Sequence, residues 1–375
     1  MKIGIVCYPT FGGSGVVATE LGMALADKGH EVHFITYNQP VRLDFISHRL
    51  HFHEVLLEEY PLFQYQPYEL ALSSKMVEVV EKYELEVLHV HYAIPHAYAA
   101  FMAKKMLQEK GIGVKVVTTL HGTDITLVGS HPTYKTAVEF SINNSDVVTA
   151  VSNSLKADTL RLFNIQKDIK VVYNFIDTKK YNKFHEEECK RNALAKSSER
   201  IVTHISNFRP VKRTGDVIKI FAKISQEIPS KLLMVGDGPE RFKAERLTKK
   251  YNLSDKVLFL GNSDEVAKIL CFSDVFLLPS TTESFGLAAL EAMAAETPVI
   301  STNAGGLPEV NINGKTGFLS NVGAVDDMAK NTITILKDDE VLARFKHNAK
   351  EHAKQFSLTT ILPAYEALYK SCSKS

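Results

Sequence analysis

Short apolar runs along the chain alternate with segments in which apolar residues recur every three or four positions. The first run, residues 3–7, leads through a glycine-rich turn to such a segment at residues 17–25. Lys28 and Gly29 then form a typical helix end, and residues 32–37 form the next apolar run. This order predicts a unit of strand, glycine turn, helix and strand.

The same alternation extends to about residue 151. Strands that alternate with helices in this way predict parallel sheets that are covered by helices on both faces. The expected helices are residues 68–83, 97–108 and 134–142, and the expected strands are residues 87–90, 114–120 and 147–151.

A hinge is expected after this first series. Residues 174–177 and the charged residues 186–191 interrupt the pattern, and the charged residues predict a solvated helix. The alternation then restarts, with expected strands at residues 201–206, 232–235, 257–260, 275–278 and 299–301 and expected helices at residues 216–228, from about 285, 325–354 and 358–369.

The restart predicts two doubly wound α/β domains in series. Residues 1–173 form an N-terminal Rossmann-like domain and residues 174–356 a C-terminal one, and we expect the helix in residues 357–375 to pack back on the first domain. In open parallel sheets, ligands bind beyond the carboxyl ends of the strands. Two such domains that face each other are expected to bind their ligands in a cleft.

Composition agrees with two soluble domains. The 375 residues are about two and a half times the roughly 150 residues of one domain. Lys and Arg number 44 and Asp and Glu 43, so the formal charge is +1, and the basic residues are scattered. This balance excludes the basic footprint of a nucleic-acid or anionic-membrane partner.

The cysteines give no sign of a metal site or a disulfide framework, because Cys7, Cys189, Cys271 and Cys372 lie far apart in the sequence. A reducing cytoplasm is therefore expected. The N-terminus has too short an apolar run for a signal peptide, and no segment reaches the roughly 20 apolar residues of a membrane span.

A glycine-rich loop, residues 10–15, follows the first expected strand. Amides at Gly13 and Gly15 could approach an anion or a polar substrate, whereas a tight turn would explain the same glycines. The spacing is not that of the dinucleotide fingerprint or of a Walker loop.

A second candidate, His121-Gly-Thr-Asp124, also follows a strand. These side chains could bind sugar hydroxyls or position a proton, but a polar loop capped by Asp124 explains the tetrapeptide somewhat better. His89, His91 and His96 lack a convergent carboxylate at metal-ligand spacing and are interpreted as loop and core histidines beside Tyr92.

In the second domain, residues 206–213 place Arg209 with Lys212 or Arg213 at the end of a strand. Guanidinium and ammonium groups suit the oxygens of a diphosphate, although short basic runs are often simply solvated. The position at the mouth of the expected cleft favours binding.

The most informative stretch is residues 279–294. A strand ends at Pro279, Gly286 permits a close approach, and a helix rich in Ala and Leu follows, which is an arrangement that favours a phosphate. Glu283 and Glu291 are eight residues apart and could hold hydroxyl groups of one extended ligand. Because Glu291 lies in an otherwise apolar helix, a hydroxyl partner is favoured over an unpaired buried carboxylate.

Together these motifs resemble the family 4 glycosyltransferases of the two-domain GT-B type. The resemblance covers nearly all of the chain: the glycine loop, His121-Gly, residues 174–177, Arg209 with Lys212, residues 235–239, the Glu-x7-Glu element at Glu283 and Glu291, and residues 305–309. It implies two Rossmann-like domains facing across a cleft and a retaining enzyme.

Residues 7–17, 89–97, 118–129 and 206–213 are more narrowly similar to members that act in bacillithiol biosynthesis. That similarity implies transfer of N-acetylglucosamine from UDP-GlcNAc to the hydroxyl of L-malate, giving GlcNAc-alpha-malate and UDP. The acceptor would be bound by the N-terminal domain and the nucleotide sugar by the C-terminal domain. A homo-oligomer is left open.

The resemblance also implies roles for single residues at the diphosphate. Arg209 and Lys212 would bind it, with help from backbone amides near Gly286 and Leu287. The interval between Arg209 and Lys212 is shorter than is usual in the family, so Arg213 competes with Lys212 for one role. The hinge also reads Asn-Phe, where many relatives have Asn-Gly.

Further roles concern the sugar and the ribose. Glu291 would hold the ribose hydroxyls and Glu283 a sugar hydroxyl, while His121 would lie against the donor sugar. Phe285 and Gly13 complete the expected donor site. The expected catalytic residues are His121, Arg209, Lys212 and Glu283.

Malate is a dianion, so its site needs hydrogen-bond donors. The acceptor candidates are the amides of Gly13, Ser14 and Gly15, the hydroxyls of Tyr92 and Thr119, and the side chains of Asn153 and Asn207.

No Asp-x-Asp signature is present, so turnover without a metal or other cofactor is expected, with cations and a helix dipole stabilising the departing UDP. The fold family implies front-face departure and attack. Three alternatives stay open: a nicotinamide-dependent oxidoreductase, disfavoured by the absent fingerprint, a non-catalytic sugar-binding protein, and a transferase with another acceptor such as inositol phosphate, a lipid or a polysaccharide.

Overall fold

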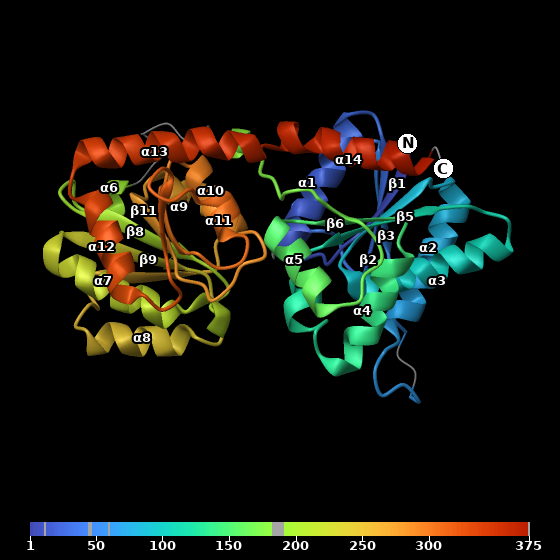
Figure 1. Cartoon of the computed structure of the whole chain (residues 1–375), viewed down its shortest axis with the longest axis horizontal. Coiled ribbons are helices and arrows are strands. Elements are labelled where there is room, and N and C mark those ends of the chain that lie inside the picture. Colours follow the sequence, from blue (N-terminus) through green and yellow to red (C-terminus); the bar gives the residue numbers. More distant parts are fainter. Residues whose placement is uncertain (11–12, 44–46, 59–60, 182–190, 374–375) are drawn as a thin grey trace. The chain divides into compact units, whose positions relative to one another are not determined.

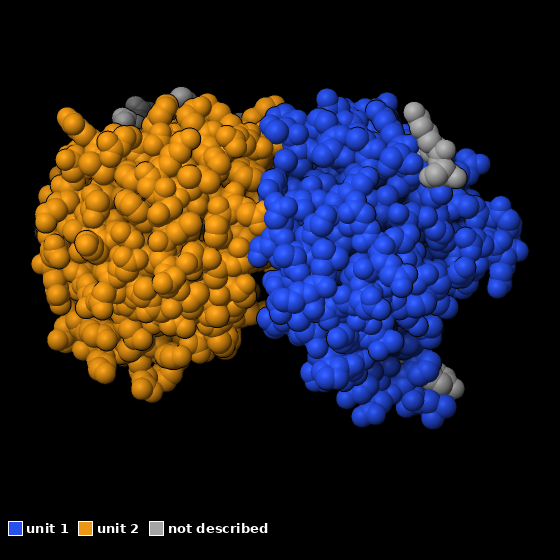
Figure 2. Space-filling view, in the orientation of Figure 1, with its two compact units in different colours: residues 1–175, 358–375 blue, residues 176–357 orange. Residues whose placement is uncertain are grey.

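The chain is divided into two units, which Figures 1 and 2 show in a computed structural model. The structure describes residues 1–10, 13–43, 47–58, 61–181 and 191–373. Unit 1 comprises Met1–Phe175 and Leu358–Ser375, and unit 2 comprises Ile176–Ser357. The helix expected at residues 186–191 lies almost entirely outside the described residues.

Unit 1 contains a seven-stranded sheet in the order β3-β2-β1-β4-β5-β6-β7, in which every neighbouring pair is parallel. The strand order reverses between β1 and β4, as in a doubly wound fold. Its strands are β1 (Lys2–Val6), β2 (Glu31–Thr36), β3 (Leu50–Glu54), β4 (Val87–His91), β5 (Lys115–Leu120), β6 (Val147–Ala150) and β7 (Ile169–Val171).

Helices of unit 1 cover both faces of this sheet (Figure 1). α1 packs against α14, and α2 packs against α3 over a core that includes Leu72, Leu88 and Val116. The helices are α1 (Gly13–Asp27), α2 (Tyr68–Tyr83), α3 (Tyr98–Glu109), α4 (Pro132–Asn144), α5 (Asn153–Leu162) and α14 (Leu358–Ser373), with short π-helical turns η1 (Ala93–Ala97) and η2 (Thr123–Leu127).

Unit 2 contains a six-stranded parallel sheet in the order β10-β9-β8-β11-β12-β13, and its strand order reverses between β8 and β11. Its strands are β8 (Arg200–Ile205), β9 (Ser230–Val235), β10 (Val257–Gly261), β11 (Val275–Leu278), β12 (Val299–Thr302) and β13 (Gly317–Ser320).

The main core of unit 2 lies between this sheet and the helices α7, α12 and α13, with Phe221, Ile335 and Phe345 among its buried members. The helices are α6 (Arg191–Leu194), α7 (Thr214–Glu227), α8 (Arg241–Lys250), α9 (Val266–Cys271), α10 (Leu287–Ala294), α11 (Leu307–Val310), α12 (Val325–Leu336) and α13 (Asp339–Ala353), with 3-10 turns η3 (Thr178–Lys180), η4 (Pro210–Lys212) and η5 (Lys354–Phe356). Within the described residues, no helix has both the length and the apolar character that a membrane span requires.

Some local expectations differ from the structure. Residues 13–15 lie in the first turn of α1 rather than in a turn before it, and α10 begins at Leu287 rather than near Phe285. Cys271 is disulfide-bonded, so the expectation of no disulfide was wrong for this cysteine. Spacing along the sequence does not report which cysteines the fold brings together.

Asp274 joins several elements of unit 2 immediately before β11. Its carboxylate accepts hydrogen bonds from Arg191 at 2.8 Å, from Lys346 at 3.0 Å and from the backbone amide of Ile201 at 2.9 Å. Burial by itself raises the pKa of Asp274, but Lys346, the Ile201 amide and Arg191 outweigh it, so the pKa is lowered. The ionised carboxylate therefore holds α6, β8 and α13 together.

We expect Asp274→Asn to lower the free energy of unfolding by about 2–3 kcal/mol at pH 7, because the two cations lose their buried counter-charge. Urea denaturation of the wild type and the variant measures this difference. Asp326→Asn is the matched control, because its pair with Lys223 is exposed, and it should leave the unfolding midpoint unchanged. Equal effects of the two substitutions would contradict this account.

Candidate active site

The candidate residues follow the strands at which the two sheets reverse. In unit 1, Ser14 comes after β1 and Tyr92 after β4, which are neighbours in the sheet. In unit 2, Lys212 comes after β8 and Glu283 after β11, which are also neighbours. Loops diverge at such a reversal and leave a crevice at the carboxyl edge, where ligands of this fold class bind.

In unit 1, the start of α1 is joined directly to the end of β4. The hydroxyl groups of Ser14 and Tyr92 are hydrogen-bonded at 2.6 Å. A Cβ atom at Gly15 would lie 2.5 Å from the carbonyl oxygens of both Tyr8 and Thr10, so only glycine fits here without a shift of the backbone. The first turn of α1 is thereby held close to the residues that follow β1.

Tyr92 is held in an unusual backbone conformation, with φ at 87°. Its amide donates to the carbonyl of Thr119 at 2.9 Å, which ties the end of β4 to β5. Burial raises the pKa of its phenol, so the hydroxyl is protonated at neutral pH. Its ring centroid lies 5.1 Å from that of His121.

His121 follows β5 and is buried against a second histidine. Its Nε2 lies 2.8 Å from Nδ1 of His91, and the two rings are stacked. Burial, with a further contribution from His96, lowers the pKa of His121 to about 3. The imidazole is therefore uncharged at neutral pH and can offer a hydrogen bond without a positive charge.

Asp124 organises the backbone around His121. Its carboxylate accepts hydrogen bonds from the amides of Ala93, His121 and Gly122 at 2.9, 3.2 and 2.9 Å. Burial raises its pKa to about 6, although these amides oppose the shift. The capping interpretation of Asp124 matches these contacts, and its carboxylate holds the His121 loop to η1.

Two expected acceptor residues are engaged elsewhere in unit 1. The hydroxyl of Thr119 is fully buried and lies 2.8 Å from Nε2 of His89 and 2.7 Å from the hydroxyl of Thr149. Asn153, at the start of α5, is exposed and donates to the Tyr173 hydroxyl at 2.9 Å. The side chain of Thr119 thus forms hydrogen bonds inside unit 1, with His89 and Thr149.

In unit 2, a lysine and a carboxylate join the loops after β8 and β11. Lys212 Nζ donates to Glu283 Oε1 at 2.5 Å, and the Ser280 hydroxyl donates to the same oxygen at 2.7 Å. The amide of Thr281 also donates to the carbonyl of Val211 at 2.8 Å. These contacts fix the two loops to each other.

Arg209 lies in the same loop as Lys212 and is exposed. Its side chain makes no hydrogen bond or ion pair with any residue that the structure describes. A guanidinium group without an internal counter-charge is available to an anionic ligand.

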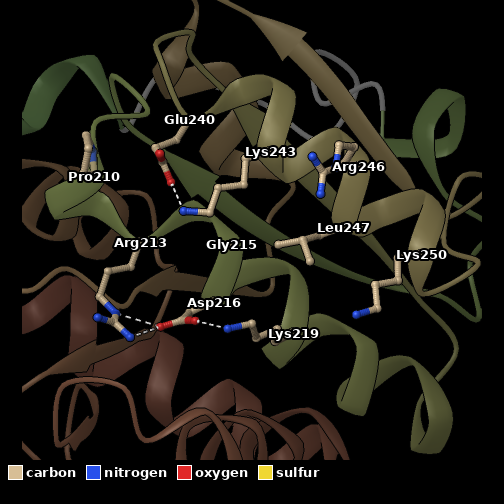
Figure 3. A pocket seen from close by; sticks show the side chains of 10 residues that line it. All are labelled: Pro210, Arg213, Gly215, Asp216, Lys219, Glu240, Lys243, Arg246, Leu247 and Lys250. Atoms are coloured by element: carbon tan, nitrogen blue, oxygen red, sulfur yellow. Dashed lines mark hydrogen bonds and ion pairs between the residues drawn. The ribbon is translucent and has the colours of Figure 1, made fainter.

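Arg213 forms an ion pair with a different carboxylate. Its Nε donates to Asp216 at 2.7 Å, and Asp216 also accepts from Lys219 at 2.9 Å. Figure 3 shows these side chains at the edge of a cavity of about 500 Å³ between α7 and α8, together with Lys243. Lys212 does not line this cavity and contacts Glu283 instead. Arg213 and Lys212, which the sequence offered as alternatives for one role, thus point to different places in the structure.

The start of α10 offers free backbone donors. Gly286, with φ at 101°, precedes the helix, and the amides of Leu287 and its neighbour in the first turn have no intrahelical acceptor. The Phe285 side chain is buried, with its ring centroid 5.7 Å from that of Phe356. Glu291 lies one turn further along α10 and is half-buried.

Asn207 is exposed after β8 and lies close to the loop after β9. The position of a Cβ atom at Gly238 would be 2.1 Å from the Asn207 carbonyl oxygen. Asn207 belongs to unit 2, whereas the other acceptor candidates belong to unit 1.

Two family models match the chain. The model described as "Glycosyltransferase Family 4" matches residues 11–180, and the model described as "Glycosyl transferases group 1" matches residues 185–352. The chain is also 50% identical over 370 residues to the N-acetyl-alpha-D-glucosaminyl L-malate synthase of Bacillus anthracis, covering 98% of this chain and 96% of that protein.

The chain belongs to the family 4 glycosyltransferases.

Solved structures agree on the fold of this glycosyltransferase. Anabaena HepE in complex with UDP and glucose has a TM-score of 0.83 and 21% identity, with 99% of this chain and 100% of that chain covered. The sucrose-phosphate synthase of Thermosynechococcus elongatus has a TM-score of 0.80 and 23% identity, with 99% of this chain and 98% of that chain covered. The expected GT-B fold is thereby confirmed.

Sequence motifs missed several partners of the glycosyltransferase's candidate residues. His91 was interpreted as a core histidine, yet it holds His121, and Asp216 was not connected with Arg213. The pairing of β4 with β5 could have placed His91 beside His121, because His91 ends β4 and His121 directly follows β5. The roles of the individual residues in binding and catalysis stay predictions.

Acid should destabilise the glycosyltransferase through its buried histidines. Burial lowers the pKa of His89 and His121 to about 3 and that of His96 to about 4. Because the unfolded chain binds these protons below about pH 6.5, the stabilisation is complete above that pH and is lost as the pH falls towards 4. Asp124 acts oppositely between its unfolded value of 3.8 and about 6, but it is a single group.

We expect the free energy of unfolding from urea denaturation to be lower at pH 5 than at pH 7 by more than about 1.4 kcal/mol. The comparison of pH 7 with pH 8 is the control, because these histidines are mostly neutral in both states over that range and stability should change little. Equal stability at pH 5 and pH 7 would contradict the neutral, buried state of the histidines.

Proposed function

We propose that this enzyme transfers N-acetylglucosamine from UDP-GlcNAc to the hydroxyl of L-malate, giving GlcNAc-alpha-malate and UDP. The observation that carries the proposal is the 50% identity over 98% of the chain to the Bacillus anthracis synthase. The reaction would be the first step of bacillithiol synthesis. A cytoplasmic location is part of the proposal.

The donor diphosphate would be bound in unit 2 by Arg209, Lys212 and the first turn of α10. Arg209 contributes an exposed guanidinium group, and the amides at Leu287 contribute donors and the positive end of the helix dipole. As UDP departs, negative charge grows on its phosphate oxygens. Donors that are already in place stabilise that charge without having to reorganise.

Lys212 is the better second phosphate ligand than Arg213. Both cations are paired with a carboxylate, but the pair with Glu283 directs Lys212 towards the loop before α10, whereas the pair with Asp216 directs Arg213 towards the cavity between α7 and α8. The carboxylate of Glu283 would then have two tasks, which are to orient Lys212 and to accept a sugar hydroxyl. Glu291, further along α10, would hold the ribose hydroxyls.

The acceptor would be bound mainly in unit 1. The amides of Gly13, Ser14 and Gly15 at the start of α1 and the protonated hydroxyl of Tyr92 can donate to the two carboxylates of malate. His121 is uncharged and would lie against the donor sugar. Asn153 and Asn207 remain acceptor candidates, whereas the hydroxyl of Thr119 is engaged with His89 and Thr149.

In the proposed reaction, the bond between the anomeric carbon and the β-phosphate oxygen breaks, and a bond to the malate hydroxyl oxygen forms on the same face. The hydroxyl proton passes to the departing phosphate oxygen. The anomeric configuration is therefore retained. No step assigns a role to a metal ion, and we expect turnover to persist in EDTA.

Substitution of Arg209 should lower turnover strongly. We expect Arg209→Ala to reduce kcat by roughly 10²-fold or more, which corresponds to about 3 kcal/mol of lost charge stabilisation. Lys212→Ala should have a comparable effect, and Arg213→Ala is the matched control with a much smaller loss. UDP release measures all three, and near wild-type turnover of Arg209→Ala would refute the phosphate assignment.

The acceptor is tested by offering L-malate, D-malate and inositol phosphate separately with UDP-GlcNAc. We expect rapid UDP release with L-malate alone. Release with inositol phosphate instead would keep the transferase but replace the acceptor. Binding of UDP-GlcNAc without release for any acceptor would favour a sugar-binding protein.

A further inference from the structure

A cluster of histidines and one glutamate lies at the edge of the unit 1 sheet. Glu31 and His33 are two residues apart on β2, so their side chains share one face. His51 on the edge strand β3 is the register partner of His33, and the two rings are stacked with centroids 4.5 Å apart. Residues from two strands therefore converge on one point.

The two distances from Glu31 to the histidines match those between ligands of one metal ion. His33 Nε2 lies 3.1 Å and His51 Nε2 lies 3.6 Å from Oε1 of Glu31. One potential ligand atom from each of the three residues lies within 4.8 Å of the others. Tetrahedral ligands at roughly 2.0–2.1 Å from zinc are about 3.3 Å apart, so the distances of 3.1 and 3.6 Å are both close to that value.

We propose that Glu31, His33 and His51 bind one Zn²⁺ ion. Two imidazole nitrogens and one carboxylate oxygen are ligands that zinc accepts, and a water molecule would complete a tetrahedron. None of these three residues takes part in the proposed transfer reaction. The site thus adds a metal-binding property that is separate from catalysis.

A second histidine on β3 can orient the buried ligand. His33 is fully buried, and its Nδ1 lies 2.8 Å from Nε2 of His53. If His33 ligates through Nε2, its Nδ1–H donates to His53, which is the outer contact typical of zinc-bound histidines. The ring of Tyr83 lies against His33 and His53, with centroids 4.5 and 5.0 Å apart, and limits their movement.

The proposed ion would join the edge strand to the rest of the sheet. Glu31 is the first residue of β2 and His51 the second residue of β3, so the site lies near the amino ends of these strands. The candidate substrate residues follow the carboxyl ends of β1, β4 and β5 instead. Zinc should therefore stabilise unit 1 without entering the reaction.

The test uses the full chain without a histidine tag, freed of metal with EDTA and then dialysed. Calorimetric titration with ZnCl2 should give one site per chain, and CoCl2 should give the visible absorption bands of a bound tetrahedral ion. His51→Ala and Glu31→Gln are the test variants, because both side chains are partly exposed and their loss is compatible with folding. His48→Ala is the control, since His48 is exposed three residues before His51.

We expect His51→Ala and Glu31→Gln each to weaken zinc binding by about 100-fold, and His53→Ala to weaken it by about 10–100-fold. His48→Ala should bind as the wild type does. Zinc should raise the melting temperature of the wild type but not that of His51→Ala. No stoichiometric binding by the wild type, or equal binding by the wild type and both test variants, would overturn the proposal.

Discussion

One ion pair spans the strand reversal of unit 2, where we propose that the donor binds. Lys212 follows β8 and Glu283 follows β11, and their contact at 2.5 Å fixes two loops that are 71 residues apart in the sequence. The Thr281 amide strengthens the same junction through Val211. Arg209 and the start of α10 are carried by these loops, so the pair positions both sources of positive potential.

At the corresponding strand ends of unit 1, two pairs of side chains that contact each other are neutral. Ser14 and Tyr92 meet across β1 and β4, and buried imidazoles of His91 and His121 replace charged partners. Burial keeps these rings uncharged at neutral pH, because a protonated imidazole would lose its hydration without a counter-charge. The two units thus share one topology but differ in the charge at their strand ends.

Alternation of strand and helix was sufficient to predict both sheets, because parallel strands read as apolar runs. Three edge strands, β3, β7 and β13, were not predicted. The sequence of β3, Leu50-His-Phe-His-Glu54, is polar at alternate positions and so does not form an apolar run. Motifs selected Arg209, Lys212 and Glu283 as candidate site residues, and their roles stay predictions. Motifs could not show that Asp216 pairs with Arg213 or that the Thr119 side chain faces the interior. They also could not show that Glu31 lies beside His51. These contacts arise only from strand pairing and side-chain direction.

The last helix of the chain completes the first unit. In α14, Tyr369 is fully buried and its hydroxyl lies 2.8 Å from Nδ1 of His89, whose ring is 4.5 Å from that of His91. Because α14 follows unit 2 in the sequence, the part of the unit 1 sheet around His89 can be covered only after residues 176–357 have been synthesised, although α1 already contacts β1 and β2.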